Sequence, residues 1–209
     1  MEKMVRSAIA TASLLGISQL EHVVNAQPQF PTDGLLRYYD FNESSGRTVK
    51  EVFNGDYNLI TENSPARVPG KLGNAMLFGD GANNYATGTG VAPDLPTGAS
   101  PRTISFWVNY QSENTSNNSN FLTTYGGNYD VKFMGTFTWQ KKPAIKFIGK
   151  EIILDVSLEP NTWSLLTYSY DGDSNFKIYF DGVPLVNQSI GLNTVLNEPF
   201  MVGARSRDN

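Results

Sequence analysis

The chain has 209 residues, of which 40% are hydrophobic, and its formal net charge is −4. This length suits one domain that removes about two-thirds of its unfolded surface from water. The only adjacent basic pair is Lys141-Lys142, so the positive field that holds a phosphate backbone is missing. The composition predicts one globular domain and argues against nucleic acid as a partner.

The first 26 residues have the pattern of a signal peptide. Lys3 and Arg6 precede a weakly apolar run from Ala8 to Ile17, and Val24-Asn25-Ala26 supplies the small residues of a cleavage site. A mobile or amphipathic N-terminal helix is the alternative, because the residues before the site are unusually polar. The apolar run falls short of the roughly 20 residues of a membrane span. We therefore expect export, cleavage after Ala26 and a secreted or cell-surface domain over residues 27–209.

Cysteine is absent, and the single histidine, His22, precedes the expected cleavage site. A processed protein would therefore contain no imidazole and no thiol. Ser-His and Cys-His nucleophilic systems and Cys/His zinc sites are excluded on this ground. Its stability must come from a hydrophobic core rather than from disulfides.

From Leu35 onward, short alternations of apolar and polar residues are interrupted by Gly, Pro, Asn and Asp, with no sustained helical periodicity. This pattern predicts about a dozen β-strands. The weaker ones are Gly34–Phe41, Tyr57–Thr61, Asn74–Phe78, Tyr85–Thr87, Phe121–Tyr125, Tyr129–Phe137 and Phe200–Gly203. The polar stretch Gln111–Asn120 is expected to be a surface loop.

The clearest strands are Arg102–Tyr110 and Trp163–Tyr170. In the first, Trp107 alternates with the apolar residues around it and so faces the opposite side. The second has apolar residues on both faces, which is typical of a central strand. We therefore assign both Trp107 and Trp163 to the core.

Two hairpins follow from turn chemistry. Asp181-Gly182 readily forms a type I′ turn and should join a strand ending at Phe180 to one running from Val183 to Asn187. Gly149-Lys150 should separate Ala144–Ile148 from Glu151–Val156. Many short strands without helices predict an all-β fold, an antiparallel sandwich of two stacked sheets.

Three segments in order resemble the laminin-G-like, concanavalin A-like jelly-roll family. They are GLLRYYDFNESSGRTVKEVFNGDYNLI, then GKLGNAMLFGDGANNYATG with TISFWVNY, and finally NTWSLLTYSYDGDSNFKIYFDGVPL. The resemblance covers residues 34–203. It implies two curved sheets, a form found in exported or adhesive proteins and appended to carbohydrate-active enzymes.

The resemblance also implies a final strand beyond Val202-Gly203 that pairs beside the first strand, whereas this sequence stops at Asn209. Either the chain is a fragment, or the strand Leu35–Phe41 has an open edge that invites pairing with another chain.

Catalytic carboxylates are not predicted. The Glu-x-Asp-x-x-Glu motif of retaining glucanases with this fold is absent. Glu151 and Asp155 would share one strand face about 13 Å apart, at roughly 3.3 Å per residue. This exceeds the separation of up to about 9.5 Å in inverting enzymes.

Calcium is the one metal for which the sequence offers suitable oxygen ligands. Asp80, Asn83 and Asn84 form the best cluster, at a position that resembles a calcium site of some family members. Asp171 and Asp173 form a second candidate. The alternative is that these side chains only cap turns.

Sugar binding requires an exposed aromatic ring beside amide or carboxylate groups. The region 118–140 offers both, and the candidate ligand-binding residues are Tyr125, Asn128, Tyr129, Asp130, Trp139 and Gln140. In the alternative, these aromatic rings fill the core.

The sequence thus predicts a non-catalytic carbohydrate-binding, lectin-like module whose partner is a glycan. A structural or adhesive domain with a protein partner is the first alternative, and a polysaccharide-active enzyme is the second.

Overall fold

The computed structural model describes residues 32–78, 84–111, 120–127, 133–139, 141–147 and 150–204. Fourteen β-strands and no helices occur in these residues, which confirms the all-β prediction. Accordingly, the described part of the chain contains no helix that could span a membrane. The expected signal peptide and most of the expected loop Gln111–Asn120 lie outside the described residues.

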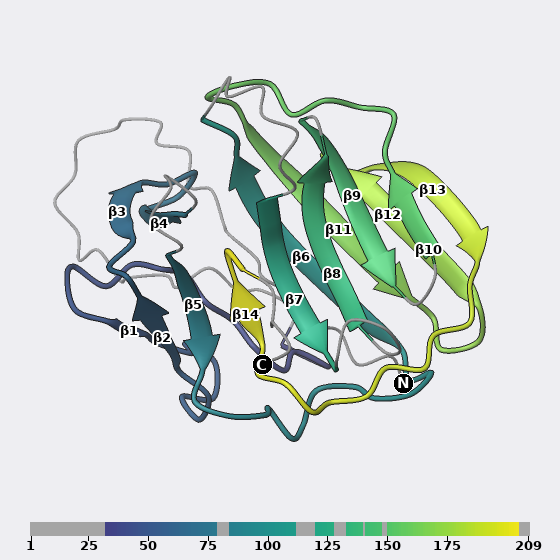
Figure 1. The fold of residues 1–209 in the computed structure, drawn as a ribbon, viewed down its shortest axis with the longest axis horizontal. Coiled ribbons are helices and arrows are strands. Elements are labelled where there is room, and N and C mark those ends of the chain that lie inside the picture. Colours follow the sequence, from purple (N-terminus) through teal and green to yellow (C-terminus); the bar gives the residue numbers. More distant parts are fainter. Residues whose placement is uncertain are drawn as a thin grey trace, which may run out of the picture.

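Two antiparallel sheets are stacked, with the larger one in front in Figure 1. Eight strands form the large sheet, in the order β1 (Thr48–Val49), β2 (Leu59–Glu62), β5 (Tyr85–Gly88), β14 (Met201–Val202), β7 (Asn120–Gly126), β8 (Phe133–Trp139), β9 (Lys142–Phe147) and β10 (Lys150–Ile153). Four strands form the small sheet behind it, in the order β13 (Val183–Ser189), β12 (Asn175–Phe180), β11 (Trp163–Tyr170) and β6 (Arg102–Asn109). A separate hairpin, β3 (Ala66–Pro69) with β4 (Asn74–Leu77), lies to one side.

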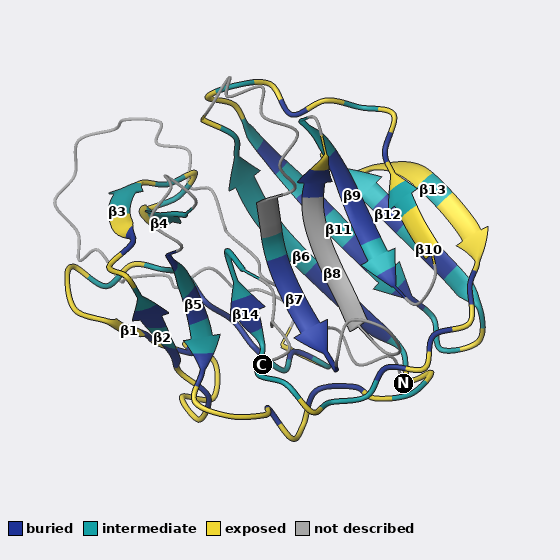
Figure 2. Cartoon of the chain, viewed as in Figure 1, coloured by how far each residue is buried: buried dark blue, intermediate teal, exposed yellow. Residues whose placement is uncertain are grey.

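The core lies between the two sheets. In β11, Leu166, Tyr168 and Tyr170 are buried, while the residues between them are half-buried, as period-two alternation requires. Phe176 and Ile178 of β12 are fully buried on the same side, and each contributes about 1.5–3 kcal/mol through its removal from water. Figure 2 shows that the exposed residues gather instead on the edge strands β10 and β13.

The β12–β13 hairpin forms where the turn chemistry predicted it. Asp181 and Gly182 both have positive φ, 49° and 81°, as a type I′ turn demands. The β9–β10 hairpin differs from its prediction by one residue, because Lys150 already pairs with Phe147. The second strand of this hairpin also ends early, at Ile153.

The segment Gly34–Phe41 does not form the predicted strand. The Tyr38 N–H donates to the Glu51 carboxylate at 2.8 Å, and the Tyr38 carbonyl accepts from the Val52 N–H at 2.8 Å. A side chain and a loop therefore contact the backbone where the apolar-polar alternation predicted strand pairing. Because no strand forms there, the open-edge alternative for Leu35–Phe41 loses its premise.

Smaller differences concern short strands. The predicted strands at 57–61 and 200–203 begin later, as β2 and β14, and the described part of the strand predicted at 129–137 lies in β8. The strands β1 and β3 were not predicted, because two to four residues are too few for a periodic pattern to stand out.

The core assignment of Trp107 and Trp163 is wrong. Both are half-buried and lie on the side of the small sheet that faces away from the core. Their strand neighbours Phe106, Val108 and Ser164 occupy the inward positions. Strand alternation separated Trp107 from the apolar face correctly, but it could not show which face the large sheet covers.

Candidate functional site

The outer face of the large sheet carries the exposed aromatic residue that the sequence selected. Trp139 ends β8 and is paired with Lys142 of β9, so both side chains leave the sheet on the same side. Ile145 and Phe147 of β9 belong to the core and define the opposite side. Trp139 is 37% exposed, in contrast with Thr138 beside it, which is buried.

Charged side chains occur on the same face of β9 and in the segment after β10. Lys142 Nζ lies 2.8 Å from Asp155 Oδ1 in an exposed ion pair. The hydrogen bond from Lys142 lowers the pKa of Asp155, so this carboxylate is ionised at neutral pH. Further along the same face, Lys146 of β9 is paired with Glu151 of β10. An exposed indole beside ammonium and carboxylate groups can stack on a sugar ring and bind its hydroxyls.

Of the remaining predicted sugar-binding residues, only Tyr125 is described, and it does not join this cluster. Tyr125 is 3% exposed and belongs to the core, and its hydroxyl accepts a hydrogen bond from Arg102 at 3.2 Å. Burial raises the pKa of Tyr125 to about 12. This is the alternative role that the sequence left open for the tyrosines. Four other candidates lie outside the described residues: Asn128, Tyr129, Asp130 and Gln140.

The calcium prediction remains a prediction. Asp80 and Asn83 lie outside the described residues, and Asn84 is 3% exposed. No group of three or more acidic or histidine side chains suited to a metal ion occurs in the described ranges.

The second calcium candidate serves a turn. Asp171 Oδ1 accepts the backbone N–H groups of Asp173, Ser174 and Asn175 at 2.9–3.2 Å. These bonds, led by that of Asp173, lower the pKa of Asp171. The oxygen is therefore committed to the β11–β12 turn, as the capping alternative predicted.

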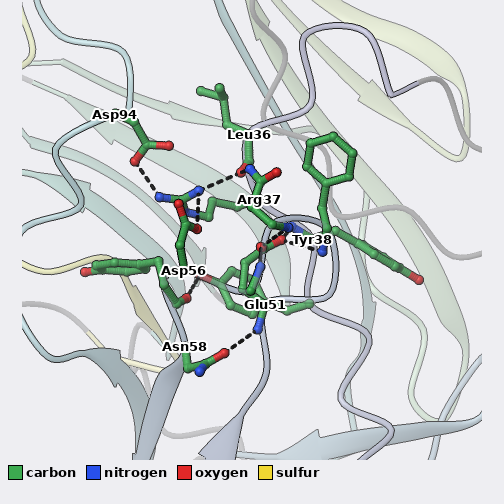
Figure 3. Close-up of polar contacts among 12 residues, drawn as sticks. Leu36, Arg37, Tyr38, Glu51, Asp56, Asn58 and Asp94 are labelled. Carbon is green, nitrogen blue, oxygen red and sulfur yellow. Dashed lines mark hydrogen bonds and ion pairs between the residues drawn. The ribbon is translucent and has the colours of Figure 1, made fainter.

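A network of ion pairs surrounds Arg37 (Figure 3). The buried guanidinium contacts Asp56 at 3.1 Å and Asp94 at 2.5 Å and also donates to the Leu36 carbonyl at 2.8 Å. Its position over the Tyr57 ring, 5.4 Å from the centroid, adds a cation–π contact. The network connects the segment before β1 with the β1–β2 loop, which carries Asp56, and with the β5–β6 connection, which carries Asp94.

Glu51 lies in the same region and is 3% exposed. Its carboxylate accepts four backbone N–H groups, from Tyr38, Phe53, Asn54 and Gly55, at 2.5–3.0 Å. Both of its oxygens are thus occupied by backbone donors. Glu51 therefore fixes the 51–55 turn and the extended segment beside it.

The outer face of the small sheet carries aromatic side chains that the sequence pattern did not place at the surface. Trp107, Trp163 and Tyr179 all occupy outward positions there. The sequence did contain an indication that Trp107 faces outward. Trp107 lies on the opposite side of its strand from Ile104 and Phe106, which face the core.

Comparison with known proteins supports the predicted family. A family model described as the concanavalin A-like lectin/glucanases superfamily matches residues 80–209, which is more than half of the chain. No curated protein sequence matches the chain at a significant level.

Several solved structures share the fold. The binding domain of Paraclostridial Mosquitocidal Protein 1 aligns with a TM-score of 0.62 at 18% identity, over 76% of this chain and 42% of that one. The receptor binding domain of botulinum neurotoxin mosaic serotype C/D aligns with a TM-score of 0.61 at 14% identity, over 78% of this chain and 41% of that domain. Domain 4 of AbnA, an extracellular arabinanase from Geobacillus stearothermophilus, was solved in complex with arabinotriose. It aligns with a TM-score of 0.52 at 17% identity, over 70% of this chain and 69% of that domain. The chain thus spans less than half of the two toxin domains.

Proposed function

This chain belongs to the concanavalin A-like lectin/glucanases superfamily, and we propose that it is an exported carbohydrate-binding module without catalytic activity. Its structural neighbours include a domain crystallised with arabinotriose and toxin domains that bind receptors. At 14–18% identity these neighbours establish the fold alone, so the ligand class has to be argued from this chain's own surface.

The exposed ring of Trp139 is the observation that carries the proposal. A strand residue of this size is normally turned into the core, because burying its ring removes a large apolar area from water. Trp139 instead lies at the surface beside the Lys142–Asp155 ion pair. That combination offers a sugar both a stacking plane and hydrogen-bonding groups.

The carboxylates described above favour binding over chemistry. Asp56 and Asp94 are held by one guanidinium, Asp155 is paired with Lys142, and Glu51 is saturated by backbone donors. A glycosidase needs one carboxylic acid that stays protonated beside a second carboxylate. Each of these four carboxylates is engaged by a cation or by backbone donors, which favours a structural role for it.

Export is the remaining part of the proposal and is supported by the signal-peptide pattern of residues 1–26. Mass spectrometry of protein secreted by a host with a general secretion pathway tests it. We expect a mature N-terminus at Gln27.

Affinity electrophoresis against soluble polysaccharides, guided by a glycan array, tests sugar binding. We expect retardation by at least one polysaccharide and a loss of affinity of about tenfold or more in Trp139→Ala, as for a central aromatic contact. Val183→Ala, which truncates an exposed apolar residue of the small sheet, is the matched control and should bind like the wild type.

Full affinity in Trp139→Ala would contradict the assigned site. The absence of any glycan ligand, together with capture of a defined protein, would favour the adhesive alternative. Release of reducing sugar at an ordinary turnover rate would contradict the non-catalytic assignment.

A further inference from the structure

The outer face of the small sheet carries an aromatic cluster that the proposed site on the large sheet does not use. Trp107 of β6 is directly opposite Leu165 of β11, and Trp163 is opposite Asn109. Trp107 and Trp163 are therefore diagonal neighbours, about 7–8 Å apart along the sheet. Tyr179 of β12 lies on the same face, opposite Thr167.

Trp107, Trp163, Leu165 and Tyr179 are half-buried on this face, which is turned away from the large sheet. Apart from Asn109, the other outward positions of β6 and β11 hold small hydroxyl residues. Ser105 and Thr167 share a hydrogen bond of 2.7 Å, and Thr103 donates to Ser169 at 3.1 Å. Thr103 is only 7% exposed, so the half-buried hydroxyl groups of Ser105, Thr167 and Ser169 are the ones with further hydrogen-bonding capacity for a ligand beside the aromatic end.

A cation lies on the aromatic end. Lys71, in the turn between β3 and β4, places its ammonium group 5.0 Å from the centroid of the Trp107 ring. Lys71 is exposed to solvent, so its charge is available to a ligand above the ring.

The charge of this face is opposite to that of the whole chain. The four strands, every residue of which is described, contain no Asp or Glu, although the formal net charge of the protein is −4. Lys177 of β12 is paired with Ser169 and adds a second outward cation. The Asp181 carboxylate, in the adjoining turn, accepts the Leu165 N–H at 2.7 Å and is committed to the backbone.

We propose that the outer face of the small sheet is a second glycan-binding surface, and that its ligand is an acidic polysaccharide. A sugar ring stacks on Trp163, carboxylates of the ligand approach Lys177 and the Lys71 ammonium over the Trp107 ring, and hydroxyls bond to the half-buried Ser and Thr side chains. A ligand of negative charge meets no repulsion from carboxylates of these strands. This inference rests on the proposed carbohydrate-binding function and adds a ligand class and a second surface to it.

The full chain is titrated with hexagalacturonate and with its fully methyl-esterified form, which keeps the rings and removes the charge. Calorimetry and tryptophan fluorescence report binding. We expect hexagalacturonate to bind more tightly than the ester, and to lose affinity as salt is raised, because screening weakens exposed charge contacts.

Two pairs of variants locate the ligand. Trp163→Ala should weaken hexagalacturonate binding about tenfold or more, whereas Trp139→Ala on the other sheet should not change it. Lys71→Gln should weaken it about two- to fivefold, as expected for one exposed charge contact, and should leave ester binding unchanged. Lys142→Gln is the matched lysine control on the large sheet and should have no effect.

Three results would overturn the inference. The first is that hexagalacturonate does not bind, and the second is that the ester binds as tightly as the acid. The third is that Trp139→Ala abolishes hexagalacturonate binding while Trp163→Ala and Lys71→Gln preserve it. In each case, binding of another glycan through Trp139 would leave the proposed function intact. Lys71 is an exposed turn residue, so its variant reports binding even if Trp163→Ala fails to fold.

Discussion

Arg102 is a buried cation held by neutral partners. It is 1% exposed, and no described carboxylate forms an ion pair with it. Its guanidinium donates to the carbonyls of Gly98 at 2.7 Å and Ser100 at 2.9 Å and to the Tyr125 hydroxyl, and it also lies 5.8 Å from the Tyr170 ring centroid. Burial lowers the pKa of Arg102. The residue therefore satisfies several acceptors at the cost of its own desolvation.

Arg102→Met should lower the free energy of unfolding by about 1–3 kcal/mol, because it leaves buried acceptors without donors. Urea denaturation measures this. The control is Arg47→Met, since Arg47 has a side chain that is 61% exposed and should change stability by less than about 0.5 kcal/mol. A more stable Arg102→Met would mean that desolvation of the guanidinium outweighs its hydrogen bonds.

At the scale of single elements, the β12–β13 hairpin depends on Gly182. This residue has φ of 81°, and a Cβ added there would meet no other atom within 4 Å, so only backbone strain opposes substitution. Gly182→Ala should destabilise the fold by about 1 kcal/mol. Gly191→Ala, in equally open space but without a positive φ, is the matched control and should be neutral or slightly stabilising in thermal melts.

The β11–β12 turn depends on the ionised form of Asp171. Because the pKa of Asp171 is lowered in the folded state, its contribution is complete above the ordinary value of 3.8 and is lost as pH falls through the folded pKa. Asp171→Asn should therefore melt below the wild type at pH 7, and the difference should shrink as pH falls through the lowered pKa of Asp171. Asp173→Asn, whose carboxylate is not part of the three turn bonds, is the matched control and should melt like the wild type at pH 7.

For the whole molecule, buried tyrosines couple folding to alkaline pH. Burial raises the pKa of Tyr39, Tyr125 and Tyr168 above the ordinary value of 10.0. The unfolded chain loses these protons first, so stability should decrease as pH rises above about 10. We expect phenolate absorbance from these residues to appear together with unfolding, as followed by circular dichroism.

Tyr168→Phe gives this prediction an internal control. The Tyr168 hydroxyl is buried and has no hydrogen-bond partner among the described residues. Its removal should raise the alkaline midpoint and should not lower stability at pH 7, because an unsatisfied buried hydroxyl is costly. Gradual ionisation of all tyrosines before unfolding would contradict the coupling.

The sequence by itself determined the local features of this protein. Alternation located the strands β6, β11 and β12, and Asp181-Gly182 specified its hairpin, because side-chain period and turn geometry depend on neighbouring residues only. The exposure of Trp139 was also anticipated as one of two alternatives.

Only the tertiary structure decided which face of each strand is covered. Trp107 and Trp163 were assigned to the core and face outward, Tyr125 was a candidate ligand residue and is buried, and Gly34–Phe41 is held by Glu51 instead of a neighbouring strand. Strand alternation defines two faces but does not say which one meets the other sheet. That choice depends on contacts between residues far apart in the sequence.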